Sequence, residues 1–143
     1  MGRVKSILKD KGDQLYTIGP QTTVYEALEI MVEKKIGSLI VAENGKLKGL
    51  FTERDYAWKV ILKGRSSRDT LVEEVMDYHP SVTPETTVEE CMNIMNDKNM
   101  RHLPVLDGDK LVGLVSIGDV VKFIIDEQKY IIDSLHNYIS DTK

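Results

Sequence analysis

The chain has 143 residues, of which 41% are apolar and 29% are charged, a composition typical of a globular domain. Its net charge of −4 is uneven, because residues 1–71 carry 13 Lys/Arg against 9 Asp/Glu and residues 72–143 carry 6 against 14. This balance argues against a general nucleic-acid binder, and no apolar run approaches the about 20 residues that cross a bilayer. The single cysteine, Cys91, rules out an internal disulfide and favours a reducing compartment, which we take to be the cytoplasm.

An internal duplication dominates the sequence. Residues 17–62 align without a gap with residues 81–126, and 16 of 46 aligned positions are identical. A helical lead-in precedes each copy, VKSIL at 4–8 and VEEVM at 72–76, and the polar segment 62–69 joins the copies. We therefore divide the chain into a first repeat, 1–66, and a second repeat with a C-terminal extension, 67–143.

Each copy shows the same order of predicted elements. A short strand ends at Pro20 or Pro84, and a helix then begins with a Thr-x-x-Glu capping box at 23–26 or 87–90. Two strands follow, joined by a turn with Asn-Gly or Asp-Gly, which favours a tight hairpin. A second helix starts at Thr52 or Ser116. The unit is therefore β-α-β-β-α, and we predict an α/β fold in which the two units pack about a pseudo-twofold axis.

The last helix is predicted to run on through residues 126–140, which have no counterpart in the first copy. Apolar pairs at 124/125, 131/132 and 138/139 lie seven residues apart, and Val121 and Leu135 complete the stripe. This spacing is typical of a helix with a packing partner. The partner is either the protein's own core or a second subunit, and we favour a second subunit and hence a homodimer.

Two similar heptapeptides mark the starts of the second helices. They are GLFTERD at 49–55 and GLVSIGD at 113–119. Each Thr/Ser-x-x-Asp fits a helix cap, in which the side chains satisfy backbone N–H groups. Each also suits a ligand, because a carboxylate accepts hydrogen bonds from both hydroxyls of a cis-diol and a helix N-terminus attracts phosphate. The two interpretations are compatible.

The doubled unit resembles a tandem pair of CBS domains, the cystathionine-β-synthase-type repeat, and in particular the stand-alone CBS-pair (Bateman module) proteins. The motifs that carry the resemblance are TIGPQTTVYEAL, SVTPETTVEECM, RHLPVLD and the two Gly-x-x-Thr/Ser-x-x-Asp heptapeptides. The resemblance implies binding of an adenosine-containing ligand in the cleft between the repeats. The ligands that the resemblance implies are AMP, ADP or ATP, and also NAD(H) or S-adenosylmethionine. It further implies a regulatory, energy-sensing module.

The resemblance also implies a set of ligand-binding residues. The motif aspartates would receive the ribose hydroxyls, the Thr or Ser would lie near the phosphates, and the opening and second strands would line the adenine. In the second copy the set is Val82, Arg101, His102, Leu103, Pro104, Ser116, Ile117, Gly118 and Asp119. In the first copy it is Ile18, Thr52, Arg54, Asp55 and Lys59.

The copies differ at the expected phosphate contact. The second copy has Arg101 and His102 just before its second strand, whereas the first copy has Gly37 and Ser38 there. We therefore rank the site of Asp119, backed by Arg101 and His102, ahead of the site of Asp55.

The sequence contains no nucleophile–base pair, P-loop, dinucleotide fingerprint or metal-ligand spacing. We accordingly expect no enzymatic activity, no catalytic cofactor and no bound metal. The leading hypothesis is a nucleotide sensor that signals to a regulated protein or through its oligomeric state. The alternative is a constitutive dimeric assembly scaffold whose cleft is vestigial.

Overall fold

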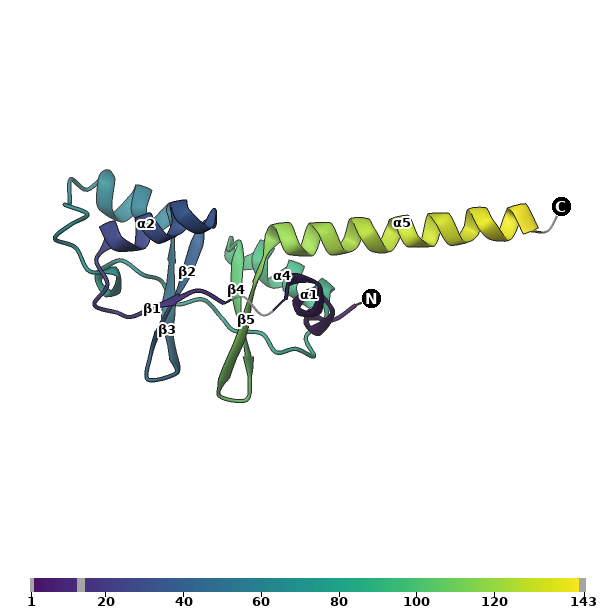
Figure 1. Ribbon diagram of the computed structural model, residues 1–143, viewed down its shortest axis with the longest axis horizontal. Helices are drawn as coiled ribbons and strands as arrows, with labels where there is room; N and C mark the ends of the chain where they lie inside the picture. The colour runs from purple at the N-terminus through teal and green to yellow at the C-terminus, as the bar shows by residue number, and fades with distance from the viewer. Residues whose placement is uncertain (1, 13–14, 142–143) are drawn as a thin grey trace.

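The structure, a computed structural model, describes residues 2–12 and 15–141 and confirms the predicted α/β fold. Two β-hairpins stand side by side, and a long helix projects from one end (Figure 1). After α1 (Val4–Lys11), the first repeat contains β1 (Thr17–Ile18), α2 (Val24–Lys34), β2 (Ser38–Glu43), β3 (Lys46–Thr52), α3 (Glu53–Tyr56) and the π-helix η1 (Ala57–Ile61). The second repeat contains the 3₁₀ helix η2 (Val72–Glu74), α4 (Val88–Lys98), β4 (His102–Asp107), β5 (Lys110–Ser116) and α5 (Ile117–Asp141).

The helix starts and hairpin turns follow the sequence signals. The hydroxyl oxygens of Thr23 and Thr87 cap α2 and α4 by accepting hydrogen bonds from backbone N–H groups three residues on. The hairpin turns place Gly45 and Gly108 at φ +77° and +63°, where a residue without a Cβ carries no steric penalty. Capping and turn chemistry therefore set the boundaries of these elements in both repeats.

The two sheets differ in size. In the first repeat β1 pairs parallel with β2, which pairs antiparallel with β3. In the second repeat β4 pairs antiparallel with β5, and the strand predicted to end at Pro84 is reduced to a single bridge between Val82 and Val105. Val82 still donates to the Pro104 carbonyl and accepts from the Leu106 N–H, both at 2.9 Å. The predicted third strand is therefore present as one bridged residue.

Each lead-in packs against the opposite repeat. Val4 and Ile7 of α1 belong to the hydrophobic core of the second repeat, and Val72 and Val75 belong to that of the first. Each folded unit therefore includes the lead-in that precedes the other copy in the sequence.

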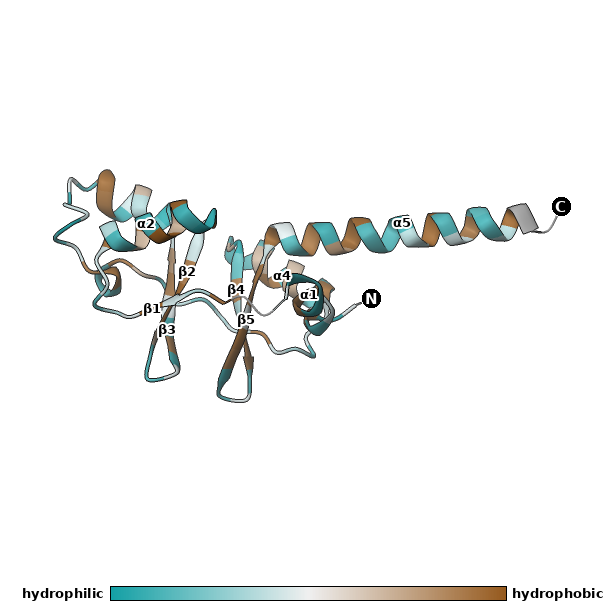
Figure 2. Ribbon diagram, in the orientation of Figure 1, coloured by the Kyte–Doolittle hydropathy of each residue, from teal (hydrophilic) through white to brown (hydrophobic). Residues whose placement is uncertain are grey.

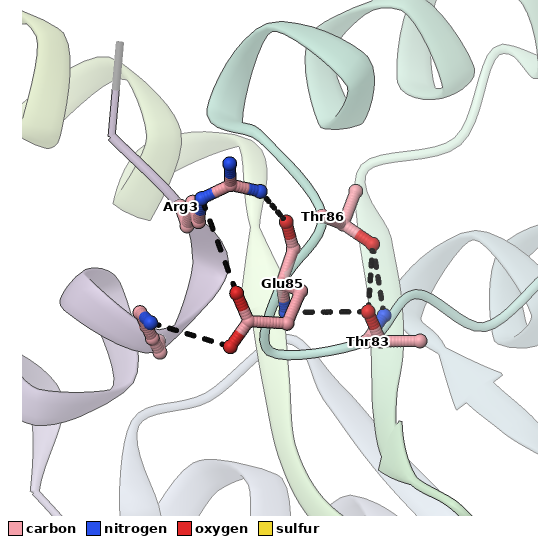
Figure 3. Close-up of polar contacts among 5 residues, drawn as sticks. Arg3, Thr83, Glu85 and Thr86 are labelled. Carbon is pink, nitrogen blue, oxygen red and sulfur yellow. Dashed lines mark hydrogen bonds and ion pairs between the residues drawn. The ribbon is translucent and has the colours of Figure 1, made fainter.

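Polar contacts hold the N-terminal lead-in on the second repeat (Figure 3). The Arg3 guanidinium donates to the Glu85 carbonyl at 2.6 Å, and the Glu85 carboxylate also pairs with Lys5 at 3.2 Å. The Val4 N–H donates to the Thr86 carbonyl at 2.8 Å. Because exposed ion pairs contribute little, the buried side chains of α1 and this backbone bond carry most of the docking.

The predicted second lead-in helix is only the short η2. The chain around it is engaged in isolated β-bridges, Leu71 with Thr23 on one side and Asp77 with Leu50 on the other. These bridges hold extended backbone close to both ends of the segment, which limits the helix to one turn.

The helix α5 has two parts. Val120 is buried in the second repeat's core, and Phe123 and Ile124 pack against that core. Every residue from 128 to 139 is exposed, and this part, which we call the arm, extends away from the body (Figure 1). Within residues 2–12 and 15–141, neither α5 nor another helix combines the length and apolarity needed to span a membrane.

Candidate ligand-binding site

Both motif aspartates complete capping boxes. Asp55 accepts a hydrogen bond from the Thr52 N–H at 2.9 Å, and its own N–H donates to the Thr52 hydroxyl oxygen at 3.2 Å. Asp119 accepts from the Ser116 N–H at 2.8 Å and donates its N–H to the Ser116 hydroxyl oxygen at 3.1 Å. The motifs are therefore helix caps, and each fixes a carboxylate at the junction of a strand and a helix.

Asp55 is a buried carboxylate in a charge network whose other members, Lys59 and Asp77, are partly exposed. Its side chain is 3% exposed, and its Oδ1 atom lies 3.1 Å from the Lys59 Nζ atom. Lys59 also pairs with Asp77 at 2.7 Å and donates to the Val75 carbonyl at 3.0 Å. Because Val75 lies in the second lead-in and Asp77 directly follows it, Lys59 ties the first motif to that segment.

The pKa values of this network are shifted. Burial raises the pKa of Asp55 above its ordinary value, although the Thr52 N–H and Lys59 act in the opposite direction. Burial also acts to raise the pKa of Asp77, but hydrogen bonds with Lys59 and Asp55 outweigh it and the pKa is lowered. Burial acts to lower the pKa of Lys59, and the two carboxylates outweigh that effect, so the pKa is raised. Lys59 is therefore held in its charged form.

Asp119 also pairs with a lysine, but its own carboxylate is more exposed than that of Asp55. The Lys11 Nζ atom lies 2.8 Å from the Asp119 Oδ2 atom and donates to the Leu114 carbonyl at 2.8 Å. The Asp119 side chain is 20% exposed, against 3% for Asp55. Since Lys11 ends α1, the second motif is tied to the first lead-in.

Two adjoining cavities lie between the repeats. The large cavity, of about 860 Å³, is lined by Thr52, Asp55 and Arg101 among others. The small cavity, of about 390 Å³, is lined by Ser38 and Asp119 among others. Residues that line both are Lys35, Ile36, Gly37, His102 and Ser116. The volumes fall within the range of small-molecule sites in proteins.

The residues predicted from the sequence divide between these cavities and the core. Thr52, Arg54, Asp55, Arg101, Ile117 and Gly118 line the large cavity only, His102 and Ser116 line both, and Asp119 lines the small cavity only. Ile18, Lys59, Val82, Leu103 and Pro104 lie outside both cavities. Ile18, Val82 and Leu103 are instead core residues with buried side chains.

The structure does not group Arg101 with Asp119. Arg101 lines the large cavity with Asp55, whereas Ser38, at the equivalent of His102 in the first copy, lines the small cavity with Asp119. Each motif carboxylate thus meets the pre-strand residues of the opposite repeat. Arg101 is therefore not beside Asp119 as the ranking made from the sequence assumed, whereas His102 lines the cavities of both carboxylates.

His102 lies at the boundary of the two cavities, opposite Ser116 in the β4–β5 register. Burial lowers the pKa of His102 to about 4, with the charges of His79 and Lys11 acting in the same direction. The imidazole is therefore neutral at pH 7 and can offer a hydrogen bond, but no positive charge, to a ligand.

The sequence reasoning missed several residues around the site. Lys11 and Asp77 lie in or just after the lead-ins, and no sequence signal shows which repeat a lead-in joins. Asn99 was also missed, and its carbonyl accepts a hydrogen bond at 2.9 Å across the repeats from Arg54, a predicted site residue whose guanidinium also stacks over Trp58. Asn99 ends α4 in the left-handed conformation, and its position directly before the pre-strand residues could have indicated proximity to the cavity.

Comparisons with known proteins agree on the family. The sequence model of the CBS domain matches residues 4–60 and 72–126. The chain is 41% identical over 123 residues to the mitochondrial CBS domain-containing protein CBSX3 of Arabidopsis thaliana, covering 82% of this chain. The chain spans 60% of the length of that relative.

Solved structures show the same fold. A CBS-domain protein from Burkholderia ambifaria superposes with a TM-score of 0.84 at 48% identity, covering 88% of this chain and 96% of that one. The hexameric CBS-CP12 protein from bloom-forming cyanobacteria superposes with a TM-score of 0.75 at 29% identity, covering 83% of this chain and 66% of that one. The chain belongs to the CBS-domain family, as a protein with two CBS domains.

Proposed function

We propose that the protein is a non-catalytic regulatory module that binds an adenosine-containing ligand between its repeats. CBS pairs are generally regulatory and nucleotide-binding as a family, and stand-alone CBS proteins are typically not enzymes. The observation that carries the proposal here is the large cavity, to which one repeat contributes the Asp55 carboxylate and the other contributes Arg101. A cavity with a carboxylate and cations on different walls suits a ligand with both hydroxyl and phosphate groups.

Basic residues of the large cavity suit the phosphates of AMP, ADP or ATP. Arg101 offers a planar guanidinium that can bind a phosphate through two hydrogen bonds, and Arg54 lies across the repeat boundary. Gly118, in the first turn of α5, also lines this cavity. We therefore assign the phosphates to the Arg101 side and the ribose to the side of Thr52 and Asp55.

The small cavity is the second proposed site. Asp119 is more exposed than Asp55 and its pairing with Lys11 is partly open to solvent. A ribose can compete with Lys11 for the partly exposed Asp119 carboxylate more readily than with Lys59 for the buried Asp55 carboxylate, because more exposed ion pairs are weaker. We propose that this site accepts the ribose of a ligand without phosphate groups, such as S-adenosylmethionine.

Signalling follows from the position of α5. Ser116 caps this helix and lines both cavities, while the arm projects away from the body. If the first turn of α5 exchanges between two positions, a ligand that binds one of them more tightly shifts the helix, and with it the arm, toward that position. The size of the shift is set by the difference between the ligand's affinities for the two positions. A regulated protein or a second subunit reads that shift. We propose the cytoplasm as the compartment, whereas the Arabidopsis relative is mitochondrial.

Thermal unfolding of protein freed of co-purified nucleotide tests the proposal. AMP, ADP, ATP, NADH and S-adenosylmethionine are added separately at millimolar concentration, with GMP as the matched control. Stabilisation of about 2.7 kcal/mol is expected when a ligand is present at 100 times its Kd. At least one adenosine ligand should raise Tm where GMP does not, and the absence of a shift with all five would reject the sensor.

A constitutive scaffold is the second candidate. The observation that favours it is that both motif carboxylates already accept a lysine, Asp55 from Lys59 and Asp119 from Lys11. Capped helix starts that are neutralised in this way can serve the packing of the repeats alone. In that case Asp119→Ala changes stability, and no ligand changes Tm.

A further inference from the structure

The arm of α5 is an exposed surface that lines neither cavity. The CBS-domain match ends at residue 126, but the helix continues to Asp141. All residues from 128 to 139 are exposed, and Figure 2 shows apolar bands recurring along this part of the helix. Helices in proteins owe most of their stability to the packing of an apolar face, so an arm with such a face calls for a partner.

The apolar face has the spacing of a paired helix. Ile131 and Tyr138 lie seven residues apart, as do Ile125 and Ile132, and Ile124, which packs against the core, begins the first of these lines. Val121 and Leu135 lie on the central line of the same face, and Gln128 falls between them at the same seven-residue spacing. A 3.5-residue period keeps one face of a helix against a supercoiled partner, and a single polar residue on the central line sets register.

The exposed area is sufficient for a specific dimer. Val121, Ile125, Ile131, Ile132, Leu135 and Tyr138 are each between 47% and 69% exposed. These side chains offer on the order of 600 Å² per chain, so that two copies bury about 1,200 Å², the lower end of the range for specific stable interfaces. A contiguous apolar patch of this area indicates an interaction site, whereas apolar side chains scattered singly over a surface do not.

The charges beside the stripe favour a parallel pair. Lys122, Lys129 and His136 occupy one flank, and Glu127 and Ser134 occupy the other. Two parallel helices set opposite flanks side by side, which brings Lys129 near the Glu127 of a second copy. Antiparallel helices would set like flanks together and bring lysine against lysine. A parallel pair in register also aligns the two Gln128 side chains, whose amides can hydrogen-bond to each other.

We propose that α5 is a self-association element through which two copies of the chain pair their arms in parallel and in register. The proposal does not use either cavity, so it stands independently of ligand binding. The continuous helix from Ser116 to the arm then joins the candidate sites of two copies through a shared coiled coil.

The mass of the full-length chain in solution is the first test, measured by light scattering or sedimentation from 1 to 100 μM. The wild type is expected to be dimeric, and Leu135→Asp is expected to weaken association at least tenfold, because it buries a carboxylate in the seam. Asp133→Ala, on the outer face of the same turn, is the matched control and should leave the mass unchanged. A monomeric wild type, or a dimer that Leu135→Asp leaves intact, would overturn the proposal.

Cross-linking tests the orientation without disrupting the helix. Leu135→Cys should form an intermolecular disulfide under mild oxidation, because a parallel register places this residue opposite its own copy. Asp133→Cys is the control and should not cross-link efficiently. The native Cys91 is buried and burial raises its pKa to about 11, so it does not compete. A dimer in which Leu135→Cys fails to cross-link contradicts the parallel arrangement.

Discussion

The Lys11 Nζ atom lies 2.8 Å from the Asp119 Oδ2 atom, although the two residues belong to different repeats of the sequence. The first motif has a corresponding tie, in which Lys59 links Asp55 to Asp77 just beyond the second lead-in. In both repeats the motif carboxylate is therefore connected to a lead-in that precedes the other copy. Docking of the lead-ins and geometry of the candidate sites depend on each other.

The two motif aspartates should contribute unequally to stability. Asp55→Ala removes a cap and a buried carboxylate that pairs with Lys59, and we expect a loss of about 2–3 kcal/mol in the free energy of unfolding. Asp119→Ala removes a cap and a partly exposed ion pair, and we expect a loss of about 1 kcal/mol. Urea unfolding of both variants measures the difference. Equal losses would contradict the distinct environments of the two carboxylates.

Two equivalent glycines report on the exchanged lead-ins. A Cβ at Gly49 would lie 2.9 Å from the Asp77 carbonyl oxygen, whereas one at Gly113 would lie 2.6 Å from the Leu8 Cδ2 atom. Backbone cannot move as easily as a leucine side chain can rotate. Gly49→Ala should therefore cost about 2–3 kcal/mol, and Gly113→Ala about 1 kcal/mol.

Chemical denaturation of the two glycine variants measures these costs. Gly19→Ala, where an added Cβ would meet no other atom within 4 Å and φ is not positive, controls for the loss of a glycine alone. If Gly49→Ala and Gly113→Ala were both as stable as the wild type, the lead-ins would not pack where the structure places them.

Acid should weaken the fold through His102. Burial lowers the pKa of this side chain to about 4, below the ordinary value of 6.5. The unfolded chain therefore binds the proton more readily, and stability that is fully present above pH 6.5 is lost as the pH falls toward 4. The loss should reach about 2–3 kcal/mol by pH 4.

A comparison with His102→Asn isolates this contribution from that of the carboxylates. The stability difference between wild type and variant, measured by urea unfolding at pH 7.5, 6, 5 and 4.5, should shrink steadily as the pH falls. A difference that stays constant over this range would show that His102 keeps an ordinary pKa in the folded protein.

The sequence predicted the local structure well, because local structure depends on local chemistry. The capping threonines Thr23 and Thr87, and the turns at Gly45 and Gly108, determine where helices and hairpins begin. The helical extension past residue 126 was also predicted from its apolar spacing. The second lead-in was predicted as a helix but forms only one 3₁₀ turn, because bridges by Leu71 and Asp77 hold the adjoining backbone extended.

The composition of the candidate site could not be predicted in the same way. Sequence order places Arg101 in the same copy as Asp119, but the packing of the repeats sets it in the cavity of Asp55. Ile18, Val82 and Leu103 were predicted beside adenine and lie in the cores, because their strands turn these side chains inward. Which side chains share a cavity depends on how the repeats face each other, and no local pattern encodes that relation.

Calorimetric titration of nucleotide-free protein tests the central claim most directly. AMP and ATP, each with adenosine for comparison, are titrated into the wild type, Arg101→Ala and Lys46→Ala, the last of which removes an exposed cation outside both cavities. Arg101→Ala should weaken the nucleotide at least tenfold, or about 1.4 kcal/mol, while adenosine binding and the Lys46→Ala variant match the wild type. Wild-type protein that binds neither nucleotide, or an Arg101→Ala variant that binds as tightly as Lys46→Ala, would contradict the account.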